Sequence, residues 1–256
     1  MFQPQVQQYE QLTVEIHPSN EALGEAAALY LIKQINTLFE DQETVNLILA
    51  TGNSMLNLYH GLCKHAEEVE WKRVRIFHMD EYVGIDDMHP ASFRRYMHEK
   101  LIDIIKPLQF FEVIGDAPDT WKECVRYAHL MKQYPADICC LGIGENGHLA
   151  FNDPPFADFN DPETVKIVTL ADKSRYQQVG EGHFASYEDV PAEAITLTIP
   201  ALLAPGCVIG IVPETRKAQA VKDALTGPIT EDCPASILRQ TPQARLFLDV
   251  DSAGLL

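Results

Sequence analysis

The stretch that decides the fold runs from residue 137 to residue 154 and reads DICCLGIGENGHLAFNDP. It begins with a short apolar run that ends at a glycine, which is typical of a buried strand. Glu145, Asn146 and His148 follow directly, among further glycines. Open α/β sheets bind their ligands at the carboxyl ends of their strands. We therefore expect a ligand-binding edge at this point of the chain.

The segments on either side of this stretch alternate between strand and helix patterns, without an internal repeat or a Gly/Ser linker. This alternation predicts an α/β fold with a mostly parallel sheet and helices on both faces. We expect one domain over residues 1–256. The predicted strands cover residues 45–50, 74–77, 111–114, 138–141, 194–199, 207–212 and 245–248, and the predicted helices cover residues 22–38, 55–65, 92–105, 120–132, 214–225 and 235–239.

Residues 155–191 break this alternation, because they are polar, rich in acids and glutamine, and only weakly periodic. A long irregular insertion just after a suspected active strand is often a lid or a binding loop. The alternative interpretation is a solvated surface excursion. Both interpretations stay open on the sequence.

The composition limits the class of protein. A net charge of −17 argues against a nucleic-acid or membrane-surface role, although a few cations and backbone amides can still hold a small anion. No apolar run approaches the roughly 20 residues that span a bilayer, and the N-terminal MFQPQVQQYEQL does not resemble a signal peptide. The six cysteines form no CxxC pair, which favours reduced cysteines in a cytoplasmic protein over a zinc site.

A first polar group lies between the predicted strand 45–50 and the helix that follows. It consists of Thr51, Gly52, Asn53 and Ser54. A helix N-terminus offers free amides and a partial positive charge, and glycine permits a tight turn. The group therefore suits a phosphate. An ordinary N-capped turn is the alternative.

A second group follows the predicted strand 74–77 and contains Asp80, Glu81 and Tyr82. Adjacent side chains of a strand point to opposite sides. One carboxylate should therefore face the crevice while the other anchors the structure. A carboxylate in the crevice can move a proton between neighbouring carbons of a sugar. The alternative is a pair that caps the next loop.

A third group returns to the opening stretch. His148 follows Gly147 on a glycine-rich turn, and Asp153 can orient it if the backbone turns between them. A fourth residue, Lys217, is predicted in the first turn of a helix, where a cation opposes the helix dipole. A cation in that position is expected to serve a bound anion, together with the phosphate loop described above.

Four motifs in order resemble the glucosamine-6-phosphate deaminases, a group allied to the 6-phosphogluconolactonases. They are MDEYVG at 79–84, HPASF at 89–93, GENGHLAFNDP at 144–154 and CPASIL at 233–238. The similarity extends from about residue 47 to residue 248. It implies a Rossmann-like, doubly wound α/β fold. It also implies conversion of glucosamine 6-phosphate to fructose 6-phosphate and ammonia, in amino-sugar catabolism, with no metal and no cofactor.

The resemblance also implies roles for single residues. Asp80 matches the base that moves a proton between C1 and C2, and His148 matches the histidine that assists opening of the sugar ring. Asp153 takes the place of a glutamate that tunes this histidine, and Asn146 stands where relatives carry aspartate or asparagine. The phosphate would lie on the amides of residues 51–54 and on Lys217, with Glu81, Tyr82 and Gly147 in supporting positions.

The chain departs from the family pattern in the lid. The arginine that binds phosphate in the family has no clear match, so Arg175 or His183 is expected to replace it. The residues that bind an allosteric amino-sugar phosphate are unmatched over 155–166, and we expect no such activation. A galactosamine-6-phosphate deaminase, a lactonase-type hydrolase and a non-catalytic sugar-phosphate sensor are the alternatives. The expected partner is a small phosphorylated sugar, bound by a monomer or a homo-oligomer.

Overall fold

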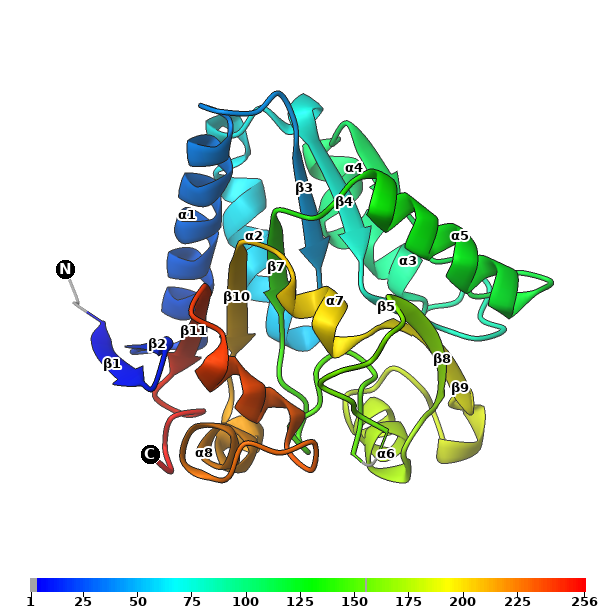
Figure 1. Cartoon of the computed structure of the whole chain (residues 1–256). Coiled ribbons are helices and arrows are strands. Elements are labelled where there is room, and N and C mark those ends of the chain that lie inside the picture. The colour runs from blue at the N-terminus through cyan, green and yellow to red at the C-terminus, as the bar shows by residue number, and fades with distance from the viewer. Residues whose placement is uncertain (1–3, 155) are drawn as a thin grey trace.

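The main sheet of the protein is mostly parallel, as predicted. The computed structural model describes residues 4–154 and 156–256. Eight strands follow the order β1-β2-β11-β10-β7-β3-β4-β6 (Figure 1). Only the β1–β2 pair in this sheet is antiparallel. The strands are β1 (Gln5–Tyr9), β2 (Leu12–His17), β3 (Val45–Leu49), β4 (Val74–His78), β6 (Gln109–Phe111), β7 (Ile138–Leu141), β10 (Cys207–Val212) and β11 (Ala244–Asp249).

Helices cover both faces of this sheet, which confirms the predicted fold class (Figure 1). Helix α1 (Asn20–Leu38) and helix α2 (Leu56–Lys64) pack closely because each carries a glycine at the contact. A Cβ atom on Gly24 would lie 2.4 Å from Asn57 Cβ, and one on Gly61 would lie 2.6 Å from Ala28 Cβ. The helices are α1 (Asn20–Leu38), α2 (Leu56–Lys64), α3 (Phe93–Met97), α4 (Asp103–Ile105), α5 (Thr120–Gln133), α6 (Asp172–Gly180), α7 (Ile199–Leu203) and α8 (Ala218–Thr226).

The order of the strands defines where a ligand is expected. From β3 the chain continues outward through β4 and β6, and it then returns to β7 on the other side of β3. The direction of winding therefore reverses between β3 and β7. Open α/β sheets bind ligands at such a switch point, outside the carboxyl ends of the strands. The loops that follow β3 and β7 are the polar segments that the sequence singles out.

One strand predicted in the main sheet lies elsewhere. β9 (Glu193–Leu197) pairs antiparallel with β5 (Asp80–Tyr82) and with β8 (Val165–Thr169), in a separate sheet of three strands. The prediction was wrong because a buried apolar strand reads the same in either sheet, and the choice depends on partners far away in the sequence. The strand expected at 111–114 is β6, which covers Gln109–Phe111 and so begins and ends earlier. The helix expected at 235–239 is a 3₁₀ helix over Pro234–Gln240.

Residues 155–191 are more regular than the sequence predicts, since they contain β8 and α6. The small sheet and this segment share a second apolar cluster with the main body. In it the Phe184 ring packs edge-on against Tyr82, with the ring centroids 5.3 Å apart. The N-terminal hairpin of β1 and β2 was also not predicted. We call residues 155–191 the lid from here on.

Candidate active site

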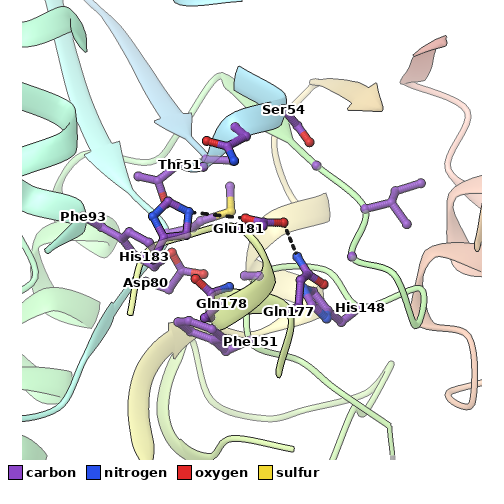
Figure 2. A pocket seen from close by; sticks show the side chains of 18 of the residues that line it. Thr51, Ser54, Asp80, Phe93, His148, Phe151, Gln177, Gln178, Glu181 and His183 are labelled. Atoms are coloured by element: carbon purple, nitrogen blue, oxygen red, sulfur yellow. Dashed lines mark hydrogen bonds and ion pairs between the residues drawn. The ribbon is translucent and has the colours of Figure 1, made fainter. Parts of the chain in front are cut away.

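A cavity lies at the carboxyl ends of β3 and β7, at the switch point of the sheet (Figure 2). Its volume is about 80 Å³. Its walls come from the loops after β3, β7 and β10, from β5 and from the lid. The residues that line it are Ala50, Thr51, Gly52, Asn53, Ser54, Met79, Asp80, Phe93, Gly142, Ile143, Gly144, His148, Ala150, Phe151, Gln177, Gln178, Glu181, His183 and Lys217.

The loop after β3 forms one end of the cavity. Gly52 adopts φ 91°, a conformation that favours glycine, and so allows the chain to turn from the strand into the 3₁₀ helix Asn53–Met55 and then into α2. The Gly52 carbonyl accepts hydrogen bonds from the Met55 amide at 3.1 Å and from the Tyr96 hydroxyl at 2.7 Å. These bonds fix the loop. The start of the helix places backbone amides and a partial positive charge beside the cavity.

Asp80 and Glu81 have separate surroundings, because neighbouring residues of β5 point to opposite sides. Asp80 lines the cavity and is only 6% exposed. Glu81 is fully buried on the other side, where its carboxylate accepts hydrogen bonds from the Ser92 hydroxyl at 2.8 Å and the Arg94 amide at 3.0 Å. The Asp80 carboxylate therefore faces the cavity, whereas the Glu81 carboxylate is held by hydrogen bonds inside the protein.

Burial raises the pKa of Asp80 well above its ordinary value, and the nearby charge of Glu81 adds to the shift. Burial also raises the pKa of Glu81, while its hydrogen bonds from Arg94 and Ser92 oppose the shift. A carboxylate with a raised pKa is a stronger base than an exposed one. Asp80 is thus equipped to take and return a proton inside the cavity.

His148 and Asp153 form a buried pair on the opposite side of the cavity. The Nδ1 atom of His148 lies 2.9 Å from Oδ1 of Asp153. An ionised carboxylate accepts a hydrogen bond, so this contact assigns the proton of the neutral imidazole to Nδ1. No described residue hydrogen-bonds Nε2, and His148 lines the cavity. Nε2 is therefore the nitrogen that is left to accept a proton.

The shorter side chain of Asp153 still reaches the histidine because its neighbours hold it there. The Asn146 amide donates to Asp153 Oδ1 at 2.8 Å, and the Asn146 side-chain oxygen accepts from the His148 amide at 3.2 Å. Burial opposes ionisation of Asp153, but its contact with His148 and its hydrogen bonds with Asn146 and Ser174 prevail and lower its pKa. Gly147 adopts φ 83° and makes the turn before His148. A Cβ atom at Gly147 would lie 2.8 Å from Cys233 Sγ.

Lys217 lines the same cavity as the loop after β3, and it follows β10 in the chain. It stands between a 3₁₀ helix, Thr215–Lys217, and α8, and only 2% of it is exposed. Among residues 4–154 and 156–256 no carboxylate lies within ion-pairing distance of its ammonium, although it lines the cavity with the Gly52 loop. Burial lowers the pKa of Lys217. A buried cation in this position is suited to an anion.

Arg175 does not line the cavity, although the sequence led us to expect it at the phosphate. Its guanidinium donates to the carbonyls of Tyr187 at 2.9 Å and Val190 at 2.7 Å, and it lies 3.8 Å above the Tyr187 ring. These contacts hold the lid together from within. The other candidate, His183, does line the cavity.

Four further residues of the lid were missed by the sequence analysis. Ser174, Gln177, Gln178 and Glu181 stand at i, i+3, i+4 and i+7, the spacing of one helix face. Gln177, Gln178 and Glu181 line the cavity, and Ser174 contacts His148 and Asp153 behind it, whereas Arg175 lies on another face. The spacing was the signal available in the sequence. Its members are polar, so a search for apolar periodicity does not find it.

Ser174 joins the lid to the histidine pair. Its hydroxyl donates to Asp153 Oδ1 at 2.5 Å and lies 3.2 Å from His148 Nδ1. Ser174 is 1% exposed. Tyr82 makes a similar connection from β5, since its hydroxyl donates to Gln178 Oε1 at 2.6 Å.

The structure offers little to other kinds of site. Within the part of the chain that the structure describes, no three His, Cys, Asp or Glu side chains are grouped to hold a metal ion. All six cysteines are free, and Cys139 and Cys140 are fully buried. None of the described helices is long and apolar enough to cross a membrane.

The fold and the cavity define an α/β protein that binds a small ligand at the switch point of a parallel sheet. Residues 18–247 match the family of glucosamine-6-phosphate isomerases and 6-phosphogluconolactonases, and the chain belongs to this family. A glucosamine-6-phosphate deaminase of Exiguobacterium sibiricum is 36% identical over 88% of this chain and 86% of its own. One of Listeria monocytogenes is 36% identical over 94% of this chain and 99% of its own.

Solved structures agree with this assignment. A monomeric glucosamine-6-phosphate deaminase superposes with a TM-score of 0.85 at 29% identity, covering 95% of this chain and 99% of its own. A 6-phosphogluconolactonase from Shewanella baltica superposes with a TM-score of 0.75 at 16% identity, covering 92% of this chain and 97% of its own. The second likeness shows the shared fold alone.

Proposed function

We propose that this protein converts glucosamine 6-phosphate and water to fructose 6-phosphate and ammonia. The observation that carries the proposal is the pairing across one cavity of Asp80, a buried base, with His148, whose Nε2 atom is left free to accept a proton. The names of the relatives, which share about a third of the sequence over most of the chain, support the same reaction. The free cysteines suit a cytoplasmic location.

The proposed reaction begins with ring opening. His148 Nε2 takes the proton of the C1 hydroxyl and returns a proton to the ring oxygen, which leaves an open-chain aldehyde. Asp153 and Asn146 hold the imidazole in the required orientation. The phosphate is held by the loop amides of residues 51–54 and by Lys217. These contacts place the sugar between the two catalytic groups.

Asp80 then performs the isomerisation. Its carboxylate removes the proton from C2, which gives an enolamine, and delivers that proton to C1 while a proton of the amino group passes to the C1 oxygen. The product is an imine at C2 with a hydroxyl at C1. The two electrons that C1 gains come from C2, and no external oxidant is required. Water adds to the imine carbon, and ammonia leaves as the C2–N bond breaks. Asp80 ends the cycle ionised, ready for the next substrate.

The first test is a direct assay of purified protein. Glucosamine 6-phosphate should give ammonia and fructose 6-phosphate in equal amounts. Galactosamine 6-phosphate and 6-phosphogluconolactone, assayed in parallel, measure the preference among related substrates. If no hexosamine phosphate is turned over, the proposal fails. Calorimetric binding of glucosamine 6-phosphate without turnover would instead assign the chain to the non-catalytic sensors.

A further inference from the structure

One residue of the lid carries the wrong charge for a phosphate site. The Glu181 carboxylate enters the cavity from the C-terminal end of α6 and lies between His183 and Gln177 (Figure 2). It lies 2.6 Å from the Arg216 guanidinium and 3.3 Å from His183 Nε2, and it accepts a hydrogen bond from Gln177 at 2.8 Å. Only 6% of its side chain is exposed. The carboxylate is therefore firmly held.

Glu181 forms an ion pair with Arg216 and lies in the same cavity as Lys217. Burial opposes ionisation of Glu181, but its contact with His183 and the charges of Arg216 and Lys217 lower its pKa to about 2. Glu181 thus carries a full negative charge at every pH at which an enzyme of this kind works. The charge of Arg216 is therefore already compensated by a carboxylate of the protein itself.

A phosphate cannot share this position with Glu181. Lys217, the Gly52 loop and Glu181 line one cavity of about 80 Å³, whereas small-molecule sites usually measure about 300–1,000 Å³. A phosphate dianion on the loop and Lys217 would lie beside the ionised carboxylate, and like charges at close range in a buried site repel strongly. Binding of phosphate therefore requires Glu181 to move away.

We propose that Glu181 is an internal competitor for the phosphate, a lid residue that sets the affinity of the site for phosphorylated ligands. Its carboxylate pairs with Arg216 and lies in the same cavity as Lys217. An arriving phosphate displaces this carboxylate from the cavity. Apparent affinity is reduced by the fraction of molecules in which the competent state is populated. The inference rests on the proposed function in one respect, that the loop and Lys217 take the phosphate.

The decisive variant is Glu181→Gln, which keeps the shape of the side chain and removes its charge. Isothermal titration calorimetry with inorganic phosphate should show a Kd at least about 10-fold lower than that of the unchanged protein, because the competing charge is gone. The matched control is Glu145→Gln. Glu145 lies 3.6 Å from the same Arg216 but does not line the cavity, so its Kd should stay within about 2-fold.

A second variant distinguishes an effect of the Glu181 charge from a change in folding. Glu181→Asp keeps the charge but draws it back by one methylene, and its Kd should fall between the other two. Thermal melts of all variants confirm that they are folded. An unchanged or weaker affinity in Glu181→Gln overturns the proposal, since it would make Glu181 a structural residue or a ligand contact.

The measurement separates this proposal from the proposed function. Tighter phosphate binding in Glu181→Gln without turnover of any hexosamine phosphate would support the competitor and refute the deaminase. Turnover of glucosamine 6-phosphate with unchanged phosphate affinity in Glu181→Gln would do the reverse. No phosphate binding in any of these variants would refute both the competitor and the phosphate site.

Discussion

Asp80, the base in the proposed reaction, is buried at a cost in stability. It is almost completely buried, yet no described ion pair or hydrogen bond satisfies its carboxylate in the way that Ser92 and Arg94 satisfy Glu81. Buried carboxylates of this kind cost stability and gain basicity. The same chain thus uses two adjacent carboxylates in opposite ways.

Replacement of Asp80 by asparagine should separate these effects. We expect kcat to fall by about 10²–10⁴-fold, the usual contribution of a general base, while binding of glucosamine 6-phosphate stays measurable by calorimetry. Steady-state assays of ammonia release provide the rate. Unchanged turnover would remove Asp80 from the role of base.

The same variant should be more stable than the parent at neutral pH. The pKa of Asp80 is higher in the folded than in the unfolded chain, so the unfolded chain releases this proton first and the free energy of unfolding falls as pH rises through that window. Asparagine has no such proton. We expect its Tm to exceed that of the parent by about 2–4 °C at pH 7.5, with the gap closing towards pH 4. A lower Tm at pH 7.5 would contradict this account.

Gly144 is needed for the position of the His148 ring. A Cβ atom at this glycine would lie 2.2–2.4 Å from three imidazole atoms. Gly144→Ala should therefore displace the ring and lower kcat/KM by about 10²-fold or more, without unfolding the chain. The control is Gly206→Ala, since a Cβ there meets nothing within 4 Å. Equal activities in the two variants would show that the ring position is not limiting.

At the scale of elements, α6 is the helix that completes the site. Gln177, Gln178 and the C-cap residue Glu181 line the cavity, and Ser174 contacts Asp153. On another face of the helix, Arg175 binds the carbonyls of Tyr187 and Val190 within the lid. The sequence marks residues 155–191 as a separate segment, but it does not reveal the face of α6 that lines the cavity. This face is polar and lacks the apolar stripe that marks an ordinary surface helix.

The Ser174 hydroxyl offers a test of this coupling. Ser174→Ala removes a hydrogen bond to a buried carboxylate, and we expect kcat to fall about 10-fold while KM changes by less than about 3-fold. Lys173→Ala, an exposed neighbour on the same helix, should behave like the parent. A rise in KM with an unchanged kcat would mean that Ser174 only holds the lid in place.

At the scale of the whole molecule, the net charge of −17 opposes compactness. Most acidic side chains lie on the surface, where salt screens their mutual repulsion over a Debye length of about 10 Å at 0.1 M. We expect Tm to rise when salt is raised from about 0.02 to 0.2 M, equally in NaCl and KCl. A Tm that falls in both salts would show that favourable surface ion pairs outweigh the general repulsion.

The sequence by itself determined the α/β class and the polar loops after β3, β4, β7 and β10. The physical reason is that local periodicity marks each strand, and the carboxyl ends of parallel strands meet at one edge of a sheet. Gly52, Asp80, His148 and Lys217 line one cavity because of this geometry alone.

The way the lid meets the carboxyl edge of the main sheet is visible in the tertiary structure alone. β9 joins β5 and β8 instead of the main sheet, Arg175 turns towards Tyr187 and Val190, and Glu181 pairs with Arg216. These arrangements depend on contacts between residues 12 to 116 positions apart in the chain. Local patterns do not encode such contacts, since a helix or strand reads the same whichever partner it packs against.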